Sequence, residues 1–174
     1  KLIKIKMEVP FLDLRVPSGS ERDEFLEALK VVLDHGRIIM GPEVLQLENA
    51  LATKIGIDYG IGTGSGTAAL ILALKGFRIG PGDEVITTPF SFVATSSAIV
   101  TVGATPIFAD ISDDLNIDPT TIEPLITSRT KAILPVHWAG RVCDMDKIMS
   151  IAKRHELLVI EDCSQACFAE YKNK

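Results

Sequence analysis

Beyond Gly56, short apolar runs rich in β-branched residues alternate with stretches of helical periodicity, and this alternation constrains the fold most strongly. Strands are predicted at 58–61, 84–88, 105–110, 131–136 and 157–161, and helices at 67–75, 92–102, 119–126 and 144–155. The runs at 132–136 and 157–160 are apolar throughout, as expected of parallel strands that are covered on both faces. The sequence therefore predicts an α/β fold with three layers around a mainly parallel sheet.

Two amphipathic helices are predicted before this alternation begins. Ser20 is expected to cap the first helix, with Asp23 three residues later as in a capping box, and Gly36 is expected to end it. Pro42 is expected in the first turn of the second helix, where an N–H group would have no partner within the helix, so that proline is tolerated. A chain of 174 residues is long enough for one domain with a real core.

Charge and cysteine content argue against several classes of protein. The net charge is −5 and the basic residues are scattered, which argues against nucleic acids and anionic membrane surfaces as partners. No apolar run approaches the roughly 20 residues that a membrane-spanning helix needs. Cys143, Cys163 and Cys167 lack the spacing of zinc ligands, so we expect free thiols in a reducing cytoplasm and no metal site.

A glycine-rich turn, GTGSGT at 62–67, connects a predicted strand to a predicted helix. The free N–H groups of a helix N-terminus attract phosphate, glycines allow its close approach, and Ser65 and Thr67 add hydroxyl donors. A capped strand-to-helix turn without a ligand is the structural alternative. The dinucleotide fingerprint fails because its third glycine would fall on Thr67, and a Walker A loop fails because the turn has no lysine.

Candidate ligand-binding side chains follow strands that end at the same edge of the sheet as this turn. Asp162 would suit a cation such as the pyridinium nitrogen of pyridoxal phosphate (PLP), or would cap the next helix. Phe92 would stack on a flat heterocycle or open a helix from the core, and Gln165 would reach a ring hydroxyl or lie in a helical turn. We expect a structural role for Glu161, and for His137 a structural hydrogen bond in preference to a contact with substrate.

Eight short segments carry a resemblance to a known family. They are GPEV at 41–44, GSGT at 64–67, GPGDEVI at 80–86, GATP at 103–106, LNIDP at 115–119, RTKAI at 129–133, PVH at 135–137 and IED at 160–162. In this order they are similar to the DegT/DnrJ/EryC1/StrS family of PLP-dependent sugar aminotransferases, and the similarity covers nearly everything from residue 7 to residue 174. The resemblance implies the large domain of PLP-dependent transferase fold type I, as in aspartate aminotransferase, in incomplete form.

The resemblance also implies roles for the candidate residues and a reaction for the family. Six residues would bind PLP. Ser65, Gly66 and Thr67 would hold the phosphate, and Phe92 would stack on the face of the ring. Asp162 would bind the pyridine nitrogen, and Gln165 would bind the ring hydroxyl. Members of the family transfer an amino group, usually from glutamate, to a nucleotide-linked keto-sugar. They are commonly homodimers whose active sites are built across the interface.

The reactive lysine of the family, which forms a Schiff base with PLP, is expected beyond Lys174. We therefore expect no catalytic residue in this chain and no activity from the fragment alone. Residues 1–6 are expected to be an appended segment and residues 7–174 the N-terminal part of the PLP-binding large domain, with the C-terminal small domain absent. Apolar faces or a sheet edge should then be exposed.

Three other functions stay open at this point. A sugar dehydratase of the same family, dependent on PLP or on pyridoxamine phosphate (PMP), would carry histidine in place of the lysine. A non-catalytic binding or regulatory relative would keep the fold without the chemistry. A nicotinamide-dependent dehydrogenase is disfavoured, because the dinucleotide fingerprint fails at Thr67.

Overall fold

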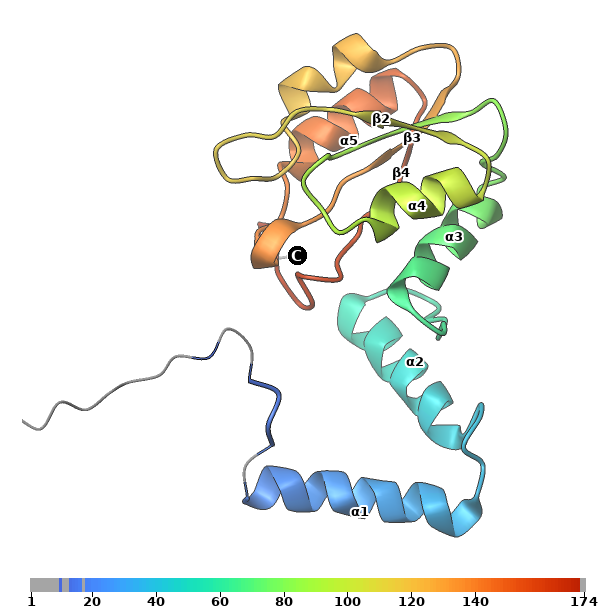
Figure 1. The fold of residues 1–174 in the computed structure, drawn as a ribbon, viewed down its shortest axis with the longest axis vertical. Helices are drawn as coiled ribbons and strands as arrows, with labels where there is room; N and C mark the ends of the chain where they lie inside the picture. The colour runs from blue at the N-terminus through green and yellow to red at the C-terminus, as the bar shows by residue number, and fades with distance from the viewer. Residues whose placement is uncertain (1–9, 11–12, 17, 173–174) are drawn as a thin grey trace, which may run out of the picture. The chain divides into compact units, whose positions relative to one another are not determined.

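The computed structural model describes residues 10, 13–16 and 18–172, and the predicted appended segment at 1–6 lies outside these residues. The chain forms two compact units, Lys1–Ile61 and Gly62–Lys174. The first contains two helices, and the second contains a sheet with its covering helices (Figure 1). No helix among the described residues is long and apolar enough to span a membrane.

The first unit contains α1 (Ser20–His35) and α2 (Pro42–Ile55). As predicted, α1 ends at Gly36, which adopts the left-handed conformation with φ of 68°, and Pro42 opens α2. The prediction that Ser20 caps α1 is wrong by one residue. Gly19 holds the cap position, its carbonyl oxygen accepts the N–H of Asp23 at 3.2 Å, and no side chain caps the helix.

The second unit is built on a four-stranded parallel sheet with the strand order β2-β1-β3-β4. The strands are β1 (Glu84–Thr87), β2 (Thr105–Phe108), β3 (Thr130–Leu134) and β4 (Leu158–Val159). The helices are α3 (Gly66–Gly76), α4 (Ala94–Thr101) and α5 (Met145–Arg154). The predicted α/β class with a parallel sheet is therefore confirmed.

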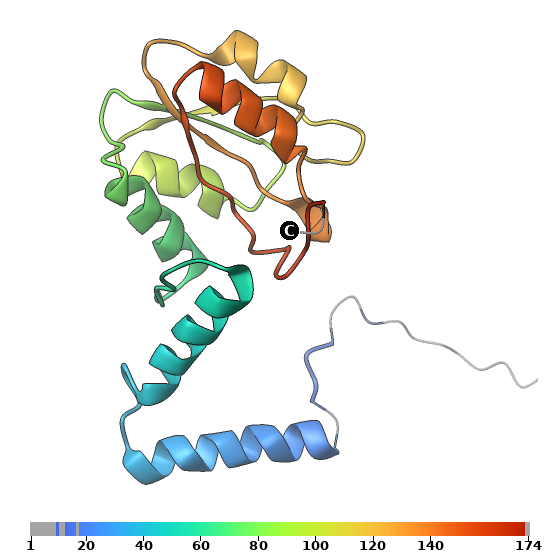
Figure 2. The same cartoon turned by 180° about the vertical axis from the view of Figure 1, so that it is seen from behind.

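Alternate strand residues divide the core of this unit into two apolar clusters. Val85 and Leu134 pack with residues of α3 and α4, whereas Ile86 and Ile133 pack with residues of α5. Both views place α5 on the opposite side of the sheet from α3 and α4 (Figures 1 and 2). The sheet is thus the middle of three layers, because successive side chains of a strand point to opposite faces.

Two predicted elements differ in the structure. The predicted strand at 58–61 is not a strand, because here the chain passes against α2, where a Cβ on Gly60 would lie 2.5 Å from the carbonyl oxygen of Glu48. The predicted helix at 119–126 is two short 3₁₀-helices, η1 (Pro119–Thr121) and η2 (Glu123–Leu125). Pro124 has no N–H group to continue the α-helical hydrogen bonding, which explains the break.

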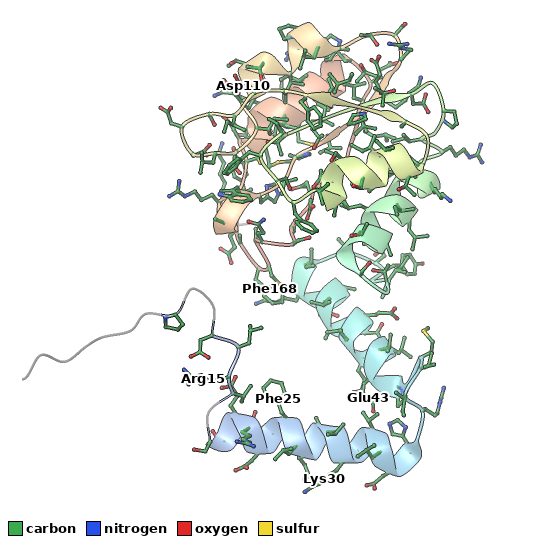
Figure 3. All side chains as sticks on the ribbon, in the orientation of Figure 1. Arg15, Phe25, Lys30, Glu43, Asp110 and Phe168 are labelled. Atoms are coloured by element: carbon green, nitrogen blue, oxygen red, sulfur yellow. The ribbon has the colours of Figure 1, made fainter. Side chains whose placement is uncertain are left out.

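Apolar side chains are exposed in the first unit, in line with the expectation from the sequence. None of the 16 described residues of α1 is buried, and Phe25, Leu29 and Leu33 are more than half exposed. Figure 3 shows Phe25 and Lys30 extending to different sides of α1. In the second unit, β2 and β4 are the outer strands of the part of the sheet that the structure describes.

Candidate functional site

A pocket of about 300 Å³ lies at the carboxyl edge of the sheet in the second unit. This volume is at the lower end of the range typical of small-molecule sites. Five of the six residues predicted to bind a cofactor line it together, namely Gly66, Thr67, Phe92, Asp162 and Gln165. Segments about a hundred residues apart in the sequence therefore form one site.

One end of the pocket is the N-terminus of α3. Ser65, the sixth predicted residue, is the N-cap of this helix, and its Oγ accepts the N–H of Ala68 at 3.1 Å. This leaves the hydroxyl hydrogen of Ser65 available to a ligand. Within an α-helix the first N–H groups have no carbonyl partner, so those of Gly66 and Thr67 are donors in the pocket wall. The capped turn and the anion-binding turn are therefore the same structure, and one does not exclude the other.

The other end of the pocket is the carboxylate of Asp162, whose side chain is almost completely buried. The residue extends the parallel pairing of β3 and β4 through a bridge with Val136, which brings it to the carboxyl edge as predicted. Its Oδ1 accepts two hydrogen bonds from Ser164, one from the backbone N–H at 3.0 Å and one from the hydroxyl at 2.6 Å. Asp162 does not cap a helix, because a turn follows it.

The second oxygen of Asp162 has no hydrogen bond donor among the described residues. Every fully buried side-chain oxygen in the described part of the chain has a hydrogen-bond partner. Because Oδ2 has none, it is not fully buried. Oδ2 is therefore an accessible anionic acceptor on a residue that lines the pocket. A cation, or a ring nitrogen that carries a proton, is the chemical partner such an oxygen favours.

An aromatic ring and an amide group also line the pocket. Phe92 is 72% exposed although it lines the pocket, so the alternative that it is a core residue is wrong. The side-chain oxygen of Gln165 accepts the N–H of Ala139 at 3.0 Å, which leaves the amide NH₂ as a donor. A flat ring held against Phe92 would thus have a donor within the same pocket.

The two residues expected to be structural are held by the protein itself. The buried ring of His137 accepts the N–H of Cys143 on Nδ1 at 3.1 Å, so its proton lies on Nε2. Nε2 lies 3.0 Å from the carboxylate of Glu161 and donates to it. Both ring nitrogens are therefore occupied within the chain.

Sequence reasoning missed three polar residues that line the pocket. Ser164 orients Asp162, and the hydroxyls of Ser91 and Thr95 lie 3.0 Å apart beside Phe92. A signal for Ser164 was present in the Asp-x-Ser spacing, because serine two residues from aspartate commonly forms local hydrogen bonds. The Ser91–Thr95 pair had no signal as clear, since it depends on the position at which α4 begins.

A helix N-terminus at the carboxyl edge of a parallel α/β sheet is a common binding site for phosphorylated ligands. The sequence model of one protein family matches residues 19–174. The chain belongs to the DegT/DnrJ/EryC1/StrS aminotransferase family.

Individual relatives agree with this assignment. The UDP-N-acetyl-3-dehydro-alpha-D-glucosamine 3-aminotransferase of Acidithiobacillus ferrooxidans is 46% identical over 163 residues, which cover 93% of this chain and 44% of the relative. The crystal structure of DesV from S. venezuelae, in complex with a ketimine intermediate, is 42% identical with a TM-score of 0.86. It matches 88% of this chain and 42% of its own.

NtdA from Bacillus subtilis, solved with the bound cofactor PMP, is 42% identical with a TM-score of 0.85, and the match covers 90% of this chain and 36% of NtdA. The chain thus spans less than half the length of each of these three proteins. PMP is the amine form of PLP. The family, the fold and the cofactor of the family that the resemblance implied are therefore confirmed.

Proposed function

We propose that the protein is a PLP-dependent aminotransferase that moves an amino group, from glutamate, to a nucleotide-linked keto-sugar. One observation carries the proposal, namely that Thr67 and Asp162 line a single pocket. This pocket combines donors for a phosphate with an acceptor for a ring nitrogen. The names of relatives that aminate nucleotide-linked sugars support the substrate class.

The residues of the pocket suit PLP in size and in donor chemistry. The N–H groups at the start of α3, with the hydroxyls of Ser65 and Thr67, would hold the phosphate. Phe92 would cover one face of the ring, and the amide of Gln165 would donate to the ring hydroxyl. Asp162 would keep a proton on the ring nitrogen through its Oδ2. When bound, PLP supplies an electron sink and a carrier for the amino group.

The lysine that reacts with PLP, and the base that moves protons during transfer, would come from polypeptide outside these 174 residues. Residues 7–174 would then be the N-terminal part of the PLP-binding large domain, and by themselves inactive. The active enzyme would be a homodimer, as the family resemblance implies. The shares of 36–44% that the chain covers in its relatives support this division.

The test uses the complete polypeptide that the gene encodes. We expect the purified protein to release PLP or PMP on denaturation and to aminate a nucleotide-linked keto-sugar with glutamate as donor. Chromatography of the sugar product and of 2-oxoglutarate measures the transfer directly. A matched control is the same protein with Asp162→Asn, which should retain its fold and lose most of its activity.

Specific outcomes would favour the alternatives. Release of NAD without PLP would overturn the cofactor assignment. Loss of a sugar hydroxyl without consumption of an amino donor would indicate a dehydratase, and histidine at the position of the reactive lysine would agree with that. PLP binding without turnover of any nucleotide-linked sugar would favour a non-catalytic relative.

A further inference from the structure

The sheet fixes the backbone of Asp162. Its N–H donates to the carbonyl oxygen of Pro135 at 2.9 Å, and its own carbonyl oxygen accepts the N–H of His137 at 3.1 Å. These two bonds place the Cα of the residue at the carboxyl edge. They leave the rotation of the carboxylate about its own side-chain bonds undetermined.

Only Ser164 among the described residues hydrogen-bonds the Asp162 carboxylate. Its hydroxyl and its backbone N–H both donate to Oδ1, at 2.6 and 3.0 Å, and neither bonds Oδ2. Two donors on one oxygen define the plane of the carboxylate more closely than one donor would. Both donors bond Oδ1, so Oδ2 keeps its capacity to accept a hydrogen bond from a ligand.

Ser164 itself belongs to the wall of the pocket. A Cβ built on Gly66 would lie 3.7 Å from its Oγ, so the hydroxyl faces the start of α3 across the space that a methyl group there would occupy. The same hydroxyl therefore bonds the carboxylate that suits a ring nitrogen and faces the turn that suits a phosphate.

We infer that Ser164 is a positioning residue that holds Oδ1 of Asp162 and thereby keeps Oδ2 directed at the ring nitrogen of the cofactor. The inference rests on the proposed function, because it needs a nitrogen-containing ring in the pocket. Ser164 acts through Asp162 and has no reacting partner of its own. Loss of its hydroxyl should reduce the preference of the site for a protonated ring nitrogen and leave the phosphate end unchanged.

The experiment compares two probes on the full-length protein by calorimetric titration. PMP carries a ring nitrogen and cannot form a bond with a lysine through an aldehyde, whereas benzyl phosphate has a phosphate and a ring without nitrogen. Ser164→Ala should weaken PMP binding by about 3- to 10-fold, the value of one hydrogen bond, and leave benzyl phosphate binding unchanged. Ser164→Thr, which restores a hydroxyl, should recover most of the PMP affinity.

A second readout is the pH dependence of binding. For the unaltered protein the affinity for PMP should fall as pH rises through the protonation midpoint of the bound ring nitrogen, which its absorbance spectrum reports. In Ser164→Ala this midpoint should shift to lower pH, because the acceptor that favours the protonated ring is less well placed. The control variant Ser128→Ala removes an exposed hydroxyl elsewhere and should change neither readout.

Each failure has a distinct meaning. Equal weakening of PMP and benzyl phosphate in Ser164→Ala would assign the hydroxyl to the phosphate end or to general packing, and would overturn the inference. Unchanged PMP affinity together with an unchanged midpoint would do the same. If the unaltered protein binds no PMP, the proposed function itself fails and the inference fails with it. Retained benzyl phosphate binding shows that the variant is folded.

Discussion

Replacing Asp162 by asparagine would alter one atom of the candidate site. The asparagine oxygen can take the place of Oδ1 and keep the two bonds from Ser164 at 2.6 and 3.0 Å, while an NH₂ group replaces Oδ2. The change thus exchanges an anionic acceptor for a neutral donor. Hydrogen bonds to charged groups contribute about 1.5–3 kcal/mol. PMP should therefore bind about 10- to 150-fold more weakly at a pH where its ring nitrogen is protonated.

Calorimetric titration with PMP at several pH values would measure this change. Above the protonation midpoint of the ring nitrogen, the NH₂ group of the variant can donate to the neutral nitrogen, so the ratio of the two affinities should shrink. Asp113→Asn removes one charge from an exposed position and serves as the control. An affinity ratio that does not depend on pH, or an equal loss in the control, would refute the assignment of Asp162 to the ring nitrogen.

Three further results are expected. Ile133→Ala should destabilise the fold by about 2–5 kcal/mol in urea unfolding, because Ile133 is fully buried in β3, whereas the exposed Lys131→Ala should change little. The hydrogen bond from Thr127 holds the pKa of Glu84 below its usual 4.5, so unfolding titrations should show stability present above that value and lost as pH falls through the lowered pKa. Glu84→Gln should flatten that dependence. Gly66→Ala should leave the free energy of unfolding unchanged or raised, because the nearest atom to the new Cβ is 3.7 Å away. The added methyl group should crowd the N–H groups at the start of α3 and so weaken the binding of inorganic phosphate.

Local patterns were enough to predict the positions of Asp162 and the glycine-rich turn. Each lies where an apolar run or a helix boundary occurs in the sequence, and parallel strands bring such boundaries to one edge. Asp118 shows the same kind of local determination, because it caps η1 through its Oδ1, which accepts the N–H of Thr120 at 2.8 Å. In these cases the nearest neighbours in sequence determine the structure.

The sequence predictions failed where the structure depends on a contact with a distant residue, or on the position of a single side-chain atom. A strand was predicted at 58–61, but the chain there packs against the backbone of α2 at Gly60, a contact that no local pattern reveals. The helix expected at 119–126 breaks at Ile122, and Pro124 lies in the first turn of η2, where it cannot donate the hydrogen bond of a continuous α-helix. For Ser164, the spacing indicates a local turn but does not tell which carboxylate oxygen the hydroxyl will occupy.

The distance between the two ends of the pocket is set by the core and not by a loop. Leu70, one turn into α3, is a core residue that packs in the same apolar cluster as Ile160, two residues before Asp162, and Leu70 also lines the pocket. The helix that offers its N–H groups and the strand end that offers a carboxylate are therefore packed in one cluster. Side chains in such cores are close-packed, so the separation between these groups can change little without repacking. Such a preformed separation suits a ligand whose phosphate and ring nitrogen lie at a fixed spacing. Little conformational entropy is then lost when the ligand binds.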